Sequence, residues 1–271
     1  MLYQLFSLFN DFPGARLMSY ISFRAVVAGV LAMCISIWVG RWFIQLLQRK
    51  NISETQRDAS IDPFNVAKKG VPTMGGVVII AAILLPCLLL GRLSNIYMIL
   101  MLITTIILGG IGFADDYIKT FRKNKDGLNG WIKIAGQITL GLIVGLTLRY
   151  SPEAVMNERV TSHIENNITV FEKSPEVKST RTTIPFFKAH DFNYADMFSF
   201  LGETNKYKAG WIFFVILTIL VVAAVSNGAN LNDGMDGMCA GNSAIIGVAL
   251  LVLAYISGNM VFSDYFDVMY I

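Results

Sequence analysis

The sequence predicts an all-α, polytopic integral membrane protein with about six transmembrane helices and an external amino terminus. Hydrophobic residues make up 54% of the 271 residues and charged residues only 15%, which lies outside the usual range of soluble globular domains. The apolar residues gather in runs close to the ~20 residues that an α-helix needs to cross a bilayer. Polar and glycine-rich segments separate these runs, so we expect membrane helices joined by loops.

Six apolar runs are candidate spans, near residues 20–47, 73–91, 97–114, 131–149, 211–226 and 240–257. They divide the chain into residues 1–149 with four helices and two motif loops, a polar insertion over 150–210, and residues 211–271 with two helices and a third motif loop. The three cysteines, Cys34, Cys87 and Cys239, are interpreted as packing residues, because their spacing matches neither a metal site nor a disulfide framework.

Lysine and arginine gather in the first and third loops, which predicts the orientation of the chain. These loops contain Arg49, Lys50, Arg57, Lys68 and Lys69, and Lys119, Arg122, Lys123, Lys125 and Lys133. The amino-terminal arm has only Arg16 and the second loop only Arg92. Cytoplasmic loops carry the excess of positive charge, so the first, third and fifth loops are expected in the cytoplasm and the 150–210 insertion outside.

The first motif loop leads into the second span with two lysines, Lys68 and Lys69, and a stretch of glycines and a proline from Gly70 to Gly76 around Thr73. Glycine lets the backbone bend so that its N–H groups can approach an anion, and the lysines add positive charge. The pattern is not a Walker loop. A cationic turn at the membrane boundary, with small residues for helix packing, explains it equally well.

The second motif loop contains two adjacent carboxylates, Asp115 and Asp116, directly after an uncharged run. Adjacent carboxylates repel each other unless a cation or a reaction uses them. Lys119 lies one helical turn beyond Asp115 and can pair with it. A carboxylate here could act as a base or a metal ligand, and Lys119 and Lys133 could attract phosphates. The alternative is a solvated helix end whose lysines only set the topology.

The third motif loop leaves the fifth span and is rich in asparagine and aspartate. Asn230, Asp233 and Asp236 follow one another at three-residue spacing, which would place them on one face of a helical turn. Their oxygens are the hard ligands that magnesium prefers. The spacing excludes an EF-hand loop, and a plain surface turn remains the alternative. Together, the three loops suit transfer of a phosphorylated group from a soluble nucleotide to a membrane-held phosphate.

The strings KKGVPTMGG, GFADDYIKTFRKNKDGL and NGANLNDGMDGM resemble the signature segments of the polyprenyl-phosphate glycosyl-1-phosphate transferase superfamily. The resemblance is greatest to its bacterial peptidoglycan branch. It implies a magnesium-dependent reaction in which UDP-N-acetylmuramoyl-pentapeptide and undecaprenyl phosphate give lipid I and UMP. It also implies a multi-pass protein of the bacterial inner membrane with its active site facing the cytoplasm, admits a homodimer, and involves no nucleic acid.

The resemblance assigns roles to individual residues. Asp115 matches the acid proposed to deprotonate the lipid phosphate, and Asp116 matches its essential neighbour. Asp233 and Asp236 match the nucleotide-sugar and metal region, where an asparagine at the position of Asn230 can reach the magnesium ion. The matched substrate-binding positions are Lys68, Thr73, Lys119, Lys133 and Asn230.

The sequence also departs from the family pattern. Asn65 stands where a histidine is frequent, and Val71 where a threonine is usual. The family has about ten spans, and its later loops supply the main magnesium-binding aspartate and a histidine-rich motif. Neither segment occurs before Ile271, so we expect a chain truncated at its carboxyl end relative to the family.

Two other functions fit parts of the pattern. A sibling transferase that moves N-acetylhexosamine-1-phosphate to the same lipid would share the Asp115–Asp116 pair and the asparagine-rich loop. An ion-coupled transporter would place its carboxylates near the bilayer midplane at broken helices. The motif loops are instead predicted to meet at one membrane face, which favours the transferase.

Overall fold

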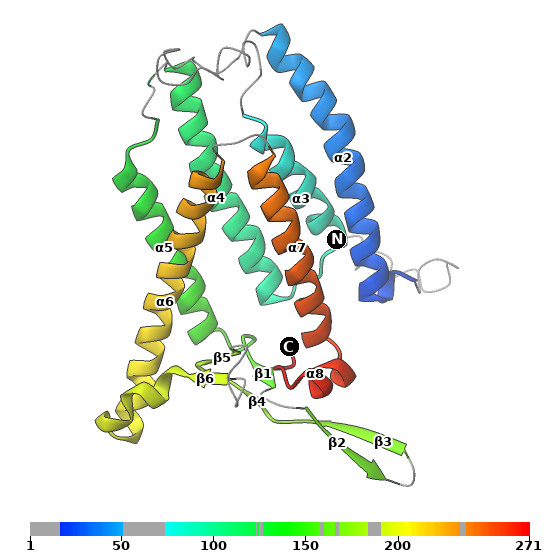
Figure 1. Cartoon of the computed structure of the whole chain (residues 1–271), viewed down its shortest axis with the longest axis vertical. Coiled ribbons are helices and arrows are strands. Elements are labelled where there is room, and N and C mark those ends of the chain that lie inside the picture. Colours follow the sequence, from blue (N-terminus) through cyan, green and yellow to red (C-terminus); the bar gives the residue numbers. More distant parts are fainter. Residues whose placement is uncertain are drawn as a thin grey trace. The chain divides into compact units, whose positions relative to one another are not determined.

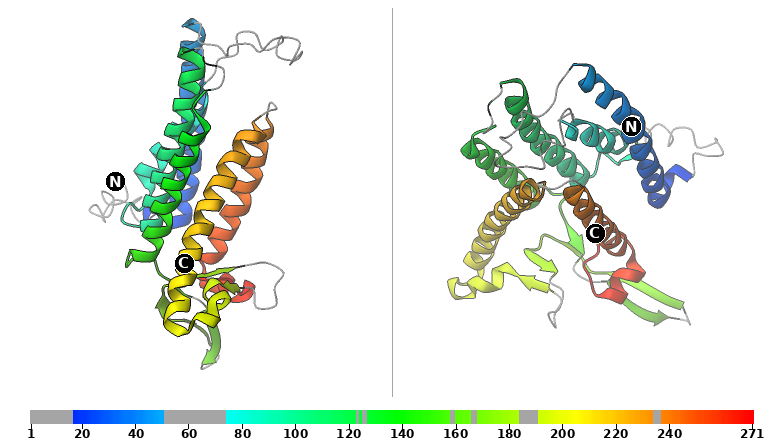
Figure 2. Two further views of the ribbon diagram at one scale, coloured as in Figure 1. Left: turned by 90° about the vertical axis from the view of Figure 1, so that its left-hand side faces the viewer. Right: turned by 45° about the horizontal axis from the view of Figure 1, so that its top comes forward.

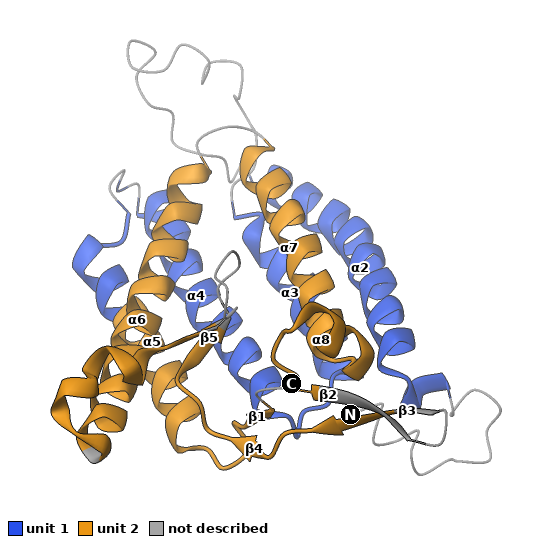
Figure 3. Ribbon diagram, turned by 60° about the horizontal axis from the view of Figure 1, so that its bottom comes forward, with its two compact units in different colours: residues 1–136 blue, residues 137–271 orange. Residues whose placement is uncertain are grey.

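The computed structural model describes residues 17–50, 74–122, 124, 127–157, 160–165, 168–183, 191–233 and 237–271. The chain forms two compact units, Met1–Gly136 and Gln137–Ile271, which are coloured separately in Figure 3. The boundary falls within helix α5 (Gly130–Tyr150), so the amino-terminal turns of this helix belong to the first unit and the remainder to the second.

The first unit is helical because its apolar runs contain few residues that interrupt a helix. Its other elements are the 3-10 turn η1 (Leu17–Ser19), α2 (Ile21–Arg49), α3 (Gly76–Leu90) and α4 (Ile96–Phe121) (Figure 1). Asn95 fixes the start of α4, because its side-chain oxygen accepts hydrogen bonds from the N–H groups of Tyr97 and Met98 at 2.8 and 3.3 Å. Such a cap satisfies donors that have no partner within the helix.

The second unit combines long helices with short strands. Its helices are the rest of α5, η3 (Tyr194–Leu201), α6 (Glu203–Asn232), α7 (Met238–Ser257) and α8 (Met260–Phe266). The strands are β1 (Met156–Asn157), β2 (Val160–Glu165), β3 (Ile168–Lys173), β4 (Glu176–Val177), β5 (Arg181–Thr183) and β6 (Asp191–Asn193). They form three two-stranded antiparallel sheets, β1 with β4, β2 with β3 and β5 with β6.

The strands and the turn η3 all lie within the 150–210 insertion, which the sequence predicted to be polar without indicating its structure. Tyr194 anchors the carboxyl end of this region, because its ring is buried against Phe213 and Phe214 of α6 and its hydroxyl donates to Thr182 Oγ1 at 2.9 Å. The insertion is therefore tied to α6 by an aromatic cluster.

Within the described residues, five helices are long and apolar enough to cross a membrane, and α3 is a shorter apolar helix of 15 residues. Figure 2 shows these helices from two further directions. The six predicted spans all correspond to helices, which confirms the all-α polytopic membrane fold. Two of them extend well beyond their predicted carboxyl ends: α4 continues beyond residue 114 and α6 beyond residue 226.

Candidate active site

Asp115 lies inside a helix and not at the start of a loop. Helix α4 continues from the apolar run through both carboxylates to Phe121. The side chain of Asp115 is only 8% exposed, whereas Asp116 beside it is partly exposed. A carboxylate this deeply buried needs compensating partners.

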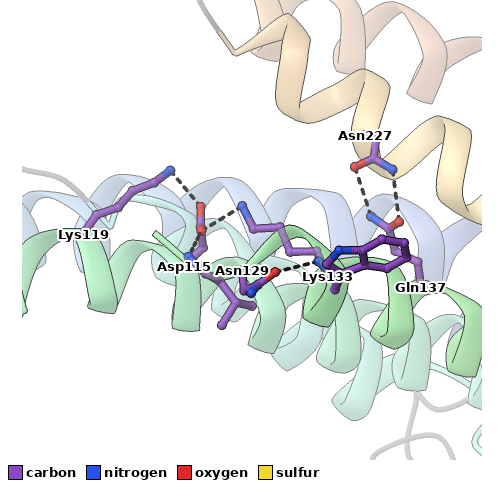
Figure 4. A network of polar contacts seen from close by, with 8 residues as sticks. Asp115, Lys119, Asn129, Lys133, Gln137 and Asn227 are labelled. Carbon is purple, nitrogen blue, oxygen red and sulfur yellow. Dashed lines mark hydrogen bonds and ion pairs between the residues drawn. The ribbon is translucent and has the colours of Figure 1, made fainter. Parts of the chain in front are cut away.

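Two lysines and a backbone N–H supply these partners (Figure 4). The ammonium nitrogen of Lys119 lies 2.8 Å from Asp115 Oδ2, which confirms the predicted pairing across one helical turn. Lys133 of α5 lies 2.8 Å from the other oxygen, Oδ1, and the N–H of Leu128 donates to that same Oδ1 at 2.7 Å. These four groups are called the Asp115 cluster below.

The turn before α5 brings Lys133 and Leu128 to the carboxylate. Gly127 within this turn has a positive φ of 69°, a conformation that strains residues with a side chain. A Cβ atom at Gly127 would collide with Asp115 Oδ1 and come within 2.7 Å of Lys119 Cε. Asn129 then begins α5, because its side-chain oxygen accepts the N–H of Trp131 at 3.0 Å (Figure 4).

The charges of the Asp115 cluster do not cancel. One carboxylate faces two ammonium groups, so these side chains together carry one excess positive charge. The lysine side chains also remain accessible, since Lys119 is 44% and Lys133 22% exposed. A lysine ammonium has three donors and can bind a second anion while it contacts the first. The cluster is therefore suited to an anionic group such as a phosphate.

The asparagine-rich segment at the end of α6 presents exposed oxygen donors. Asn230 lies in the last turn of α6, and Asp233 caps its carboxyl end; both residues are exposed. In the described part of the chain, no hydrogen bond or ion pair involves either side chain. The helix ends at Asn232, so a single helical face is not continued through Asp233.

Three predicted site residues, Lys68, Thr73 and Asp236, lie outside the described residues. The structure therefore brings together Asp115, Lys119 and Lys133 in the first unit and shows Asn230 and Asp233 in the second. Across the described ranges, no group of three or more histidine, cysteine, aspartate or glutamate side chains is arranged to hold a metal ion.

A second polar network joins α5 to α6 within the second unit. Gln137 is only 3% exposed, and its Nε2 donates to Ser226 Oγ at 3.1 Å and to Asn227 Oδ1 at 3.4 Å. Asn227 Nδ2 donates back to Gln137 Oε1 at 3.1 Å and to Ala223 O of its own helix at 2.9 Å.

The sequence predicted neither the close contact of Gly127 with Asp115 nor this amide network. A glycine within a basic run, and two amide side chains within apolar runs, were the available signals. Neither signal identifies a partner, because the partner of each residue is set by how the chain folds in space.

Residues 98–270 match the model of the family described as glycosyl transferase family 4. The chain is 61% identical over 274 residues to a protein of Phocaeicola vulgatus named phospho-N-acetylmuramoyl-pentapeptide-transferase. Proteins of the same name from Bacteroides thetaiotaomicron and Porphyromonas gingivalis are 59% and 47% identical. Each alignment includes 100% of this chain and 65% of the relative, so the chain spans less than two thirds of the length of these relatives.

The matched region contains the whole Asp115 cluster and the exposed end of α6 with Asn230 and Asp233. It begins after the first motif loop, to which Lys68 and Thr73 belong. The family model covers more than half of the chain, and the resemblance inferred from the three motif loops agrees with it: the chain belongs to glycosyl transferase family 4.

Proposed function

We propose that this chain transfers phospho-N-acetylmuramoyl-pentapeptide from its UDP carrier to undecaprenyl phosphate, which yields lipid I and UMP. An oxygen of the lipid phosphate attacks the sugar-linked phosphorus of the donor, and the bond to UMP breaks. The observation that carries the proposal is the Asp115 cluster, a buried carboxylate with two accessible lysines. The names of the relatives support the choice of donor and acceptor.

The lysines of the cluster would bind phosphate. An incoming phosphate carries more negative charge than a single carboxylate, so it competes with Asp115 for Lys119 and Lys133. A carboxylate that loses a cationic partner becomes a better proton acceptor. Phosphate binding would thereby free Asp115 to take the proton of the attacking phosphate, with Asp116 as its neighbour at the same site.

Asn230 and Asp233 fit a magnesium ion in the chemistry of their donor atoms. Their exposed side chains offer an amide oxygen and a carboxylate, and magnesium is usually held by one or two protein carboxylates together with substrate phosphates and water. Asp236 would act with them in the nucleotide-sugar and metal region, and Lys68 and Thr73 would bind substrate. Bound magnesium would neutralise the diphosphate and stabilise the departing UMP.

The proposal includes the orientation of the chain in the membrane. The lysine-rich first and third loops would face the cytoplasm, where a soluble nucleotide is available, and the 150–210 insertion would lie outside. The protein would act in the bacterial inner membrane, with homodimer formation compatible with this placement.

Release of UMP tests the proposal directly. The purified 271-residue chain is incubated in detergent with undecaprenyl phosphate and magnesium, and it is offered the UDP-muramoyl-pentapeptide or UDP-N-acetylglucosamine in parallel. We expect UMP with the muramoyl donor alone and none when magnesium is chelated. Release with the acetylglucosamine donor alone would identify the sibling transferase, and release with neither donor would contradict the proposal for this chain.

A further inference from the structure

Helices α5 and α6 contact each other at four points along one line of α5 in the second unit. Every fourth residue of α5 takes part: Gln137, Gly141, Gly145 and Arg149. Their partners on α6 run in the opposite direction: Asn227, Ile219, Val215 and Trp211. Residues four apart lie on one face of a helix, so this line is an antiparallel seam.

In the middle of the seam the two helices approach each other closely, but their contacts there have no preferred direction. A Cβ atom at Gly141 would lie 2.7 Å from Ile219 Cα, and one at Gly145 would lie 3.3 Å from Val215 Cα. Small residues of this kind let membrane helices approach closely. Dispersion contacts between glycine and aliphatic surfaces have little preference for one axial position, so they do not by themselves select a register.

The amide end of the seam is directional. Gln137 and Asn227 each donate a hydrogen bond to the other, and Gln137 also reaches Ser226. Sliding α6 by one turn, about 5.4 Å, would bring Val222 and Ala223 to the places of Ser226 and Asn227 in one direction, and Asn230 and Leu231 in the other. Either slide breaks the reciprocal amide pair, and the loss of hydrogen-bond partners by a buried amide is costly where water cannot replace them.

We propose that Gln137 and Asn227 are positioning residues whose reciprocal amide pair fixes the axial register of α6 on α5. The register sets where the end of α6 lies along α5, and this end carries Asn230 and Asp233. Each member of the pair is also within about one turn of a predicted substrate-binding residue of its own helix, Lys133 or Asn230. The expected effect of the register on catalysis rests on the proposed function. The role of the pair in fixing the register does not depend on that function.

Spin-label distances test the register without any substrate. Labels are attached to cysteines at Leu146 of α5 and Leu231 at the end of α6, which are 43% and 82% exposed, after Cys34, Cys87 and Cys239 are replaced by serine. These positions lie far apart along the seam, so their distance responds to sliding. We expect a narrow distribution in the parent, and a shift of up to about 5 Å or a clear broadening in Gln137→Leu/Asn227→Leu.

The exchange variant Gln137→Asn/Asn227→Gln separates positioning from simple loss of polarity. It keeps both amides and their combined length, so it should restore the parent distribution, whereas Gln137→Asn alone should not. If the double leucine variant does not fold, the exchange variant and Gln137→Asn still test whether the amide pair fixes the register. An unchanged distribution in the double leucine variant or in Gln137→Asn, or a folded exchange variant that fails to restore it, would overturn the proposal.

Thr147→Val is the matched control on α5, because the Thr147 hydroxyl bonds to Ile143 O of its own helix at 2.7 Å. This variant should leave the spin-label distance unchanged. In the UMP assay, we expect the double leucine variant to raise KM for the UDP donor about ten-fold and the exchange variant to recover it. If no donor gives UMP, the proposed function fails while the distances still decide the register.

Discussion

The Asp115 cluster and the Gln137–Asn227 pair are both polar groups on apolar helices, but they are completed in different ways. The amides of Gln137 and Asn227 satisfy each other, and little of Gln137 reaches solvent. The Asp115 cluster instead keeps an excess positive charge on two partly exposed lysines. A pair of polar groups whose hydrogen bonds are all made within the protein stabilises the fold. A cluster that keeps an accessible excess charge is instead able to bind a ligand of opposite charge.

The largest effect that this comparison predicts is on turnover in Asp115→Asn. The neutral amide cannot accept the proton and no longer offsets the charges of the two partly exposed ammonium groups. We expect turnover to fall by about 10²–10⁴-fold with membrane insertion unchanged, measured as UMP release and as the yield of folded protein in detergent. Near-parental turnover would remove Asp115 from the role of base.

Gly127→Ala tests whether the Asp115 cluster depends on its turn. The substitution strains a backbone with φ of 69° and pushes into Asp115 and Lys119, so we expect a loss of about 2–4 kcal/mol in unfolding free energy. Turnover should fall about 100-fold as the lysines are displaced. Thermal unfolding and UMP release measure the two effects.

Gly130→Ala is the control for this substitution. No described atom lies within 4 Å of a Cβ atom built at Gly130, and its φ is not positive. Equal losses in both variants would show that the close approach at Gly127 has no particular importance.

The two lysines should differ because they differ in exposure. Lys133, at 22% exposed, is less screened by solvent than Lys119, at 44%. We expect Lys133→Gln to raise KM for undecaprenyl phosphate about ten-fold and Lys119→Gln to raise it less. Steady-state kinetics at two salt concentrations check the order, and a larger effect at Lys119 would reverse the assignment.

The sequence predicts local features of this fold better than distant contacts. Apolar runs of sufficient length required the helices, and the spacing of four residues gave the pair of Asp115 and Lys119. The contact of Lys133 with Asp115 could not be predicted, because it depends on the positive φ of Gly127 and on where Asn129 starts α5.

The end of α6 shows the same limit. The composition of residues 227–233 favours a turn, yet the helix continues to Asn232. Asn227 is held there by a bond to Ala223 O and by the amide of Gln137, which lies 90 residues earlier in the chain. Four of the six strands of the 150–210 insertion were missed because they have only two or three residues, too few for an alternating pattern to be recognised.

The smallest predicted effect is on stability, and it concerns the α5–α6 seam next to the Gln137–Asn227 pair. Gly141→Ala places a Cβ atom 2.7 Å from Ile219 Cα, a backbone atom that cannot rotate away, so α5 and α6 must separate. Gly247→Ala in α7 is the control, because no described atom lies within 4 Å of its Cβ position.

Alanine favours a helix over glycine by about 1 kcal/mol at either position, so the difference between the two variants isolates the clash. We expect Gly141→Ala to be less stable than Gly247→Ala by about 1–3 kcal/mol, measured by thermal unfolding in detergent, with turnover reduced only a few-fold. Equal stability of the two variants would mean that α5 and α6 separate at Gly141 with no loss of unfolding free energy. The close approach of Gly141 to Ile219 would then contribute nothing to holding the two helices together.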